Sequence, residues 1–199
     1  MIKLNTSLLL LLFATFGMAQ SKIHPCAQSK IKASNFKSNT LTPSQIAKSE
    51  LYHVHYYNFD LNMTNLSTHV SGTVEIHGLA LESLDTVIFE LYSTYSISEI
   101  KLNGTPSVYK RVNSAIYVPV SLNLNEKFNI SITYDGNAPT SATNPLGGGG
   151  LTNASSPTWG NQVTWSLSQP YSAYEWFPCK QSLKDKIDSV RMSVTVPSA

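Results

Sequence analysis

Short runs in which apolar and polar residues alternate with a period of two dominate the sequence. The first is YHVHYYNFDLNM (52–63), and HVSGTVEIHGLAL, AIYVPVSL and KFNISITYDG follow it, each bounded by turn residues. Such alternation puts the apolar side chains on one face of an extended chain, which is typical of half-buried β-strands. Asn103-Gly104 is typical of a two-residue hairpin turn, and Asn113-Ser114 is a weaker signal. Because no amphipathic helix separates the runs, we predict an all-β fold, an antiparallel sandwich or saddle of sheets.

Two segments interrupt the strand pattern. Residues 21–49 are polar and rich in Lys and Ser, and only TPSQIAKSE predicts a short helical turn, with Thr42 as its N-cap and Pro43 in its first position. Residues 137–160 contain four consecutive glycines at 147–150, and we predict a loop there. A phosphate-binding loop is excluded because no Lys-Ser or Lys-Thr pair follows the glycines.

The N-terminus, MIKLNTSLLLLLFATFGMAQ, has the parts of a secretory signal peptide. Lys3 gives a basic start, an apolar run extends from Leu8 to Phe16, and the small residue Ala19 precedes the expected cleavage site. We therefore expect a signal peptide over 1–19, a polar linker over 20–49, and export to the periplasm or the outside. A membrane anchor is the alternative, but the apolar run is too short to span a bilayer comfortably.

The charge and cysteine content exclude several classes of protein. Charged residues make up 13% of the chain and the formal net charge is +2, so the basic footprint of a nucleic-acid-binding protein is missing. Neither a His-Glu-x-x-His helix motif nor a Gly-x-Ser-x-Gly motif occurs. Cys26 and Cys179 form no Cys-x-x-Cys pair, and in an oxidising compartment they either join as a disulfide or remain free. A nucleophilic Cys179 would need a histidine partner, which the sequence does not identify.

His53 and His55 form a His-x-His pair in the first predicted strand. A regular strand points both rings to the same face, and imidazole is a common metal ligand. However, no carboxylate or third histidine is obviously placed to complete a site. The favoured interpretation is a pair of half-exposed strand residues, and no metal site is predicted in this chain.

The most distinctive stretch is SLSQPYSAYEWFPCKQSLKDKIDSV (166–190). Pro170 and Pro178 restrict its backbone, and its aromatic residues are expected to cover the end of a sheet. With the strands before it, this stretch resembles the aminopeptidase N family of zinc metallopeptidases, in particular its bacterial branch near the leukotriene hydrolase-like enzymes. The resemblance covers roughly 50–199, and the matching residues are Gln169, Phe177-Pro178-Cys179, Asp185-Lys186 and the strand to Val196. One departure is Tyr174, which stands where many relatives have Arg.

The resemblance implies that residues 50–199 are the N-terminal β domain that precedes a thermolysin-like catalytic domain in this family. The motifs that hold zinc in the catalytic domain are absent, so we expect a fragment truncated before that domain, inactive alone and without a cofactor of its own. In the full-length family, zinc activates the water that releases N-terminal amino acids from peptides. The resemblance places Gln169 where the family contacts the α-amine of the peptide, so the implied partners are that amine and the missing catalytic domain.

A stand-alone secreted β-sandwich binding module is the alternative function. Such a module should line aromatic side chains along an exposed sheet face. A domain that lacks its catalytic partner should instead show one exposed apolar patch.

Overall fold

The computed structural model describes residues 40–139, 149–168 and 170–198. The predicted signal peptide, most of the predicted linker, Cys26 and Gln169 lie outside the described residues. Within these residues, no helix has the length and apolar character needed to cross a membrane. The prediction of an all-β fold is confirmed, because strands in three sheets make up most of the described structure.

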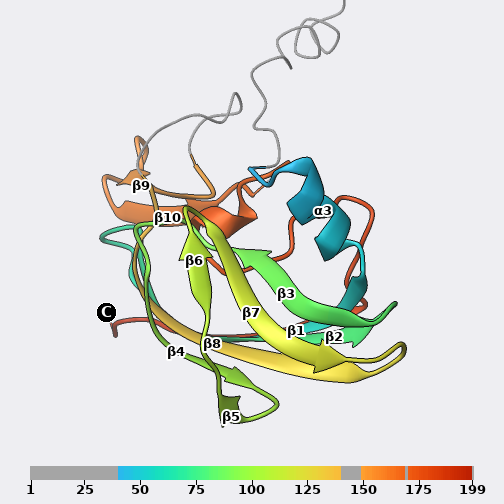
Figure 1. Cartoon of the computed structure of the whole chain (residues 1–199). Helices are drawn as coiled ribbons and strands as arrows, with labels where there is room; N and C mark the ends of the chain where they lie inside the picture. The colour runs from blue at the N-terminus through green and yellow to red at the C-terminus, as the bar shows by residue number, and fades with distance from the viewer. Residues whose placement is uncertain (1–39, 140–148, 169, 199) are drawn as a thin grey trace, which may run out of the picture. The chain divides into compact units, whose positions relative to one another are not determined.

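The largest sheet has six strands in the order β11-β1-β2-β8-β4-β5. They are β1 (Tyr52–Met63), β2 (His69–Ala80), β4 (Ser96–Leu102), β5 (Thr105–Pro106), β8 (Lys127–Asn137) and β11 (Ser189–Thr195). A three-stranded sheet of β3 (Leu84–Glu90), β7 (Ala115–Leu122) and β6 (Lys110–Val112) lies across one face of it (Figure 1). A separate hairpin joins β9 (Leu151–Ser155) to β10 (Gln162–Ser166).

The core lies between the two larger sheets and follows the period-two pattern. The inward residues of β1, β2 and β8 are almost fully buried: Val54, Tyr57, Phe59, Leu61, Val70, Val74, Ile76, Phe128, Ile130, Ile132 and Tyr134. Facing them are inward residues of β3 and β7, among them Val87, Phe89, Ile116 and Val118. Burial of these side chains is the main driving force for the fold.

The short helix expected near residue 42 is present as α3 (Pro43–Ser49). Thr42 accepts a hydrogen bond from the Gln45 amide, and the Gln45 side chain accepts one from the Thr42 amide at 2.7 Å. This capping box satisfies amides at the helix start that have no partner within the helix. The Asn103-Gly104 turn is also confirmed, because both residues have positive φ (50° and 82°), as a type I′ hairpin requires.

Two strand predictions are wrong in detail, and one pairing was not predicted. Leu151–Ser155 was expected in a loop but forms β9, because pairing with β10 supplies the order that its polar sequence does not predict. The strand predicted to end at Asp135-Gly136 runs on to Asn137, paired with β2. β11 lies parallel to β1 rather than antiparallel. The parallel pairing is feasible because all of β2 to β10 lies between these two strands in the sequence, which is ample for the crossover that parallel neighbours need.

Candidate functional site

The candidate site is the connection between β10 and β11, which contains the stretch singled out in the sequence. Gln169 lies outside the described residues, but both of its neighbours are described. Ser168 is fixed from two sides: its carbonyl oxygen accepts from the Ser172 amide at 2.9 Å, and its hydroxyl accepts from the Trp176 indole at 3.0 Å. A short 3-10 helix, η2 (Ala173–Glu175), follows.

The aromatic side chains in and just after η2 pack into the core or against it. Trp176 is buried, and its carbonyl oxygen accepts a hydrogen bond from the Tyr134 hydroxyl at 3.0 Å. The Phe177 ring contacts Phe59 and Trp176, with ring centroids 5.0 Å and 4.6 Å apart. Tyr174 is buried beside Tyr92, with the two ring centroids 5.8 Å apart. The connection is thus anchored on the large sheet by its aromatic side chains.

Glu175 joins this connection to the glycine segment. Its carboxylate is fully buried and accepts a hydrogen bond from the Gly150 amide. A Cβ atom on Gly150 would lie 2.0 Å from the Ser172 carbonyl oxygen, so the close approach requires glycine. The last of the four glycines therefore allows close packing against the connection.

Cys179 anchors the Pro178-Cys179 corner to the three-stranded sheet. Its amide and carbonyl exchange hydrogen bonds with Glu90 at the end of β3, at 2.9 Å and 2.8 Å. Its buried thiol has no disulfide partner among the described residues, which do not include Cys26, and burial, with a smaller contribution from Glu90, raises its pKa well above the ordinary value. A protonated thiol without solvent access is a poor nucleophile, which agrees with a structural role.

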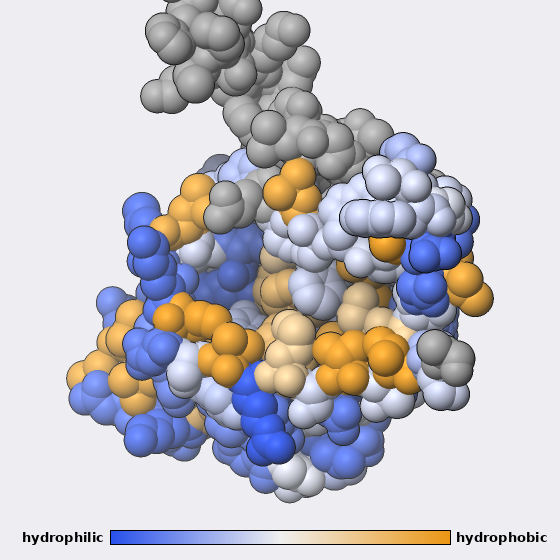
Figure 2. Space-filling view, turned by 180° about the vertical axis from the view of Figure 1, so that it is seen from behind, coloured by the Kyte–Doolittle hydropathy of each residue, from blue (hydrophilic) through white to orange (hydrophobic). Residues whose placement is uncertain are grey.

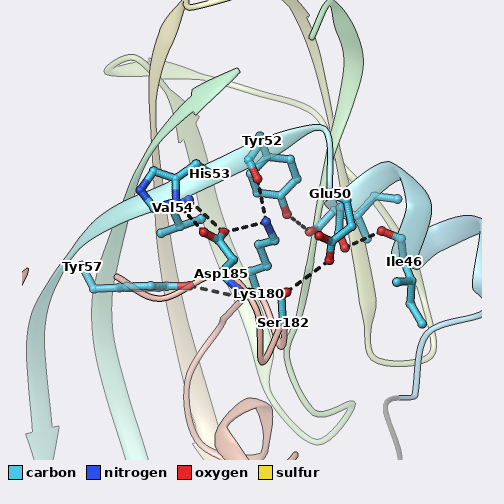
Figure 3. A network of polar contacts seen from close by, with 11 residues as sticks. Ile46, Glu50, Tyr52, His53, Val54, Tyr57, Lys180, Ser182 and Asp185 are labelled. Atoms are coloured by element: carbon cyan, nitrogen blue, oxygen red, sulfur yellow. Dashed lines mark hydrogen bonds and ion pairs between the residues drawn. The ribbon is translucent and has the colours of Figure 1, made fainter. Parts of the chain in front are cut away.

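A polar network fixes the segment after Cys179 to the start of β1 (Figure 3). The Lys180 ammonium donates to the Tyr52 carbonyl oxygen and to Asp185 Oδ2, both at 2.6 Å. Asp185 also accepts from the Val54 amide at 3.1 Å and is hydrogen-bonded to Nδ1 of His53. The ion pair is nearly enclosed, with the side chain of Lys180 4% exposed and that of Asp185 13% exposed.

The electrostatics of this network favour the ionised carboxylate. Burial raises the pKa of Asp185, but the hydrogen bonds from Lys180, His53 and Val54 outweigh it and hold the pKa below the ordinary value. The charged run after Cys179 suggested ion pairs that include Lys180 and Asp185, and this pair is present. Another partner of Asp185, Val54, is 131 positions away in the chain, so no local pattern could have predicted this contact.

An exposed apolar groove lies beside this network. It has a volume of about 360 Å³, and its lining includes Phe59, Phe177, Pro170, Leu183, Val190 and Met192. Leu183, Val190 and Met192 are each more than half exposed, at 59%, 53% and 52%. Figure 2 shows this face as a hollow with an apolar floor and a row of apolar atoms along its rim.

The groove exists because the large sheet extends one strand beyond its cover. In the parallel pairing, Val190 is in register with Tyr57 and Met192 with Phe59. Partners in register share a face, so Val190 and Met192 point to the core side of the sheet. They remain about half exposed, at 53% and 52%, whereas Tyr57 and Phe59 beside them are buried, so the core is open at this edge.

The described residues contain no group of three or more His, Cys, Asp or Glu side chains that could hold a metal ion. They therefore do not fit the catalytic zinc of the family that the sequence resembles, and no catalytic step through zinc is derived for this chain.

No family model matches the sequence, and no curated protein matches it. Solved structures do match. An M1 zinc metallopeptidase from Deinococcus radiodurans, a mutant bound to a Tyr-Ser-Ala substrate, gives a TM-score of 0.61 at 23% identity over 73% of this chain. Leukotriene A4 hydrolase from yeast gives 0.60 at 17% identity over 74% of this chain.

These matches cover 33% and 23% of the two solved chains, so this chain spans a third of their length or less. The matching part is their N-terminal region. At these identities the likeness establishes the fold and not the activity. The chain therefore has the all-β fold found in the N-terminal region of M1 zinc metallopeptidases.

Proposed function

We propose that this chain is the N-terminal β domain of an exported zinc aminopeptidase, an enzyme that removes N-terminal amino acids from peptides. The observation that supports this most strongly is the combination of an M1 N-terminal fold with an open apolar edge. Export is supported by the signal-peptide pattern of residues 1–19. Zinc and the general base would come from the catalytic domain.

In this proposal the groove binds the catalytic domain. Apolar surface at Leu183, Val190 and Met192 is unfavourable in water and becomes stabilising when a partner covers it. The rigid parts of the connection, with Trp176 and the Lys180–Asp185 pair buried beneath it, keep the groove in one shape before the partner arrives.

Gln169 is proposed to bind the free amine of the peptide. It follows Ser168, which two hydrogen bonds fix, and precedes Pro170, which lines the groove. A side-chain amide oxygen at this point would accept a hydrogen bond from the substrate ammonium, and so select peptides by where they begin.

The stand-alone binding module finds less support. Trp159 and Trp165 are exposed on the β9–β10 hairpin and its turn, which would suit stacking on a ligand. However, the apolar groove lies away from these two residues, at the edge of β11, and neither tryptophan lines it. An exposed apolar groove at a sheet edge is the kind of surface that a partner domain covers.

The test of this function starts with the isolated 199-residue chain. We expect it to hydrolyse no aminoacyl-nitroanilide above a blank, and to gain activity when combined with a thermolysin-like zinc domain from the same organism, whether that domain is encoded in the same reading frame or separately. Zinc-dependent turnover by the isolated chain would contradict the proposal, as would failure of every such domain to bind it.

The role of Gln169 has its own test in the assembled enzyme. Gln169→Ala should lower kcat/KM at least about tenfold, because a hydrogen bond to a charged group is lost, while Gln169→Glu should retain activity. The matched control is Gln162→Ala on β10, whose side chain bonds to Ser155 and should leave the kinetics unchanged. Equal kinetics for Gln169→Ala and the control would overturn the amine-binding role without affecting the domain assignment.

A further inference from the structure

β11 is an edge strand, and it carries few of the features by which proteins prevent edge strands from pairing. Among the described residues it forms one end of the six-stranded sheet, and all seven of its residues are exposed. An edge strand presents unpaired backbone N–H and C=O groups, to which another extended chain adds readily. The strand contains no proline, and Arg191 is its only charged residue. β11 is therefore open to pairing along its whole length.

The other edges of the two larger sheets are protected. At the far end of the six-stranded sheet, β5 is only two residues long and includes Pro106. In the three-stranded sheet, β6 is three residues long and carries Lys110 and Arg111. β3, at the other edge of that sheet, is flanked by α3 and pairs with Cys179 through Glu90. Short strands, proline, lysine and covering elements are the means by which natural sheets avoid edge pairing, so the contrast indicates that β11 has a partner.

One face of β11 is apolar. Val190, Met192 and Val194 are in register with buried residues of β1, so they point to the core side of the sheet. They remain 53%, 52% and 41% exposed. Arg191 and the hydroxyl side chains of β11 alternate with them and point to the outer side. A strand added at this edge would cover part of the apolar side chains on one face and meet small polar ones on the other.

We propose that β11 pairs with β11 of a second copy of this chain, antiparallel and across a twofold axis, so that two six-stranded sheets join into one. A twofold interface uses the same surface on both copies, so the edge must complement itself. β11 meets this condition when Met192 of one copy lies opposite Met192 of the other. Val190 then opposes Val194, and Arg191 opposes Ser193. Apolar side chains thus meet on the core side, and no like charges meet on the outer side.

The register about Met192 is the one that uses the whole strand. It pairs every residue of Ser189–Thr195. An axis at Arg191 would bring two guanidinium groups together, which is destabilising. An axis at Ser193 would place Ser189 opposite Pro197, which has no N–H to donate. The sequence of the edge therefore favours both the partner and the register.

The pairing concerns the chain by itself and does not depend on the proposed function. Val190 and Met192 also line the groove, so a catalytic domain bound there would compete with the second copy. If the proposed function holds, addition of that domain should convert the dimer into a one-to-one complex.

The first experiment is sedimentation equilibrium of the purified chain over a range of concentrations. We expect a reversible monomer–dimer equilibrium with a dissociation constant in the micromolar range, because the interface is a single pair of strands. Met192→Arg should give a monomer, since it places like charges opposite each other on the axis. The matched control is Val108→Arg, which changes an exposed valine outside β11 and should dimerise as the wild type does.

Disulfide cross-linking tests the register. In a Cys26→Ser background the remaining cysteine, Cys179, is buried. Met192→Cys should then form a linked dimer under mild oxidation, because residues directly opposite in an antiparallel pair lie within disulfide reach. Val194→Cys alone should not, because its two thiols would lie about 13 Å apart along the strands. A mixture of the Val190→Cys and Val194→Cys chains should form a linked heterodimer.

The wild-type measurement keeps the proposal independent of the folding of the variants. A chain that stays monomeric up to millimolar concentration would overturn it, even if a thermolysin-like domain bound the same edge. A dimer that Met192→Arg leaves intact would show that the copies join elsewhere. Equal cross-linking of Met192→Cys and Val194→Cys would exclude the ordered pairing. None of these results would affect the domain assignment.

Discussion

Asp185 is the residue on which the site's geometry depends most. It accepts hydrogen bonds from the Lys180 ammonium at 2.6 Å and the Val54 amide at 3.1 Å, and it is hydrogen-bonded to His53. One carboxylate thus joins the segment before β11 to the start of β1. Because these contacts lower its pKa, Asp185 stabilises the fold only while it is ionised.

This gives a pH-dependence prediction for Asp185→Asn. The folded chain holds the pKa of Asp185 below its ordinary value, so its stabilising effect is fully present above the unfolded pKa and is lost as pH falls through the folded one. At pH 7 the variant should lose about 3 kcal/mol of unfolding free energy, because Lys180 is left buried without its counterion. In urea titrations, the difference in unfolding free energy between wild type and variant should become smaller as the pH falls below the ordinary pKa of an aspartate.

The control is Asp60→Asn, on the exposed side of β1, which should change the unfolding free energy little at any pH. If the difference in unfolding free energy between wild type and Asp185→Asn stayed constant down to pH 2, this account would be wrong.

At the scale of elements, periodicity predicted the strands but not their neighbours. A period of two determines which side chains share a face, and this was sufficient for β1, β2, β7 and β8. It carries no information on which strand lies beside which, so the parallel pairing of β11 with β1 was missed. β9 was missed because LTNAS has little apolar character, and its order comes from its partner β10.

The contact between η2 and the glycine segment is also a long-range effect, and it yields a test. Gly150→Ala places a methyl group 2.0 Å from the Ser172 backbone oxygen, so the two segments must separate. We expect a loss of about 1–3 kcal/mol of unfolding free energy, as in other overpacked sites, and a red shift in the fluorescence of the buried Trp176 as water reaches it.

Gly160→Ala is the comparison for this substitution. Gly160 has a positive φ of 71° but open space around it, so the new methyl group costs backbone strain without a clash. It should lower stability without shifting the emission of Trp176. If both variants gave the same fluorescence change, close packing at Gly150 would not be what orders the connection.

For the whole molecule, pairing in three dimensions determines what the site contains. The sequence marked His53, His55 and the 166–190 stretch as unusual, and the resemblance singled out Asp185. Their partners come from other strands: His77 lies beside the partly exposed His55 through the β1–β2 register, and Val54 meets Asp185 through the fold of the connection. The groove likewise follows from sheet order, because Val190 and Met192 are exposed only where β11 forms the uncovered edge.

This open edge predicts how the isolated chain behaves in solution. Val190 and Met192 lie in one continuous apolar surface with Phe59 and Phe177, so the chain should bind the dye ANS and self-associate at high concentration. Replacing both with Lys should abolish dye binding and light scattering. Because both side chains are more than half exposed, the unfolding free energy should change by no more than about 0.5 kcal/mol.

The control is Val108→Lys. It replaces a valine that is 76% exposed and lies outside the groove, so dye binding should not change. The double Lys variant should no longer bind the catalytic domain, whereas the Val108→Lys variant should still bind it. Normal assembly of the double variant would show that the partner domain binds elsewhere.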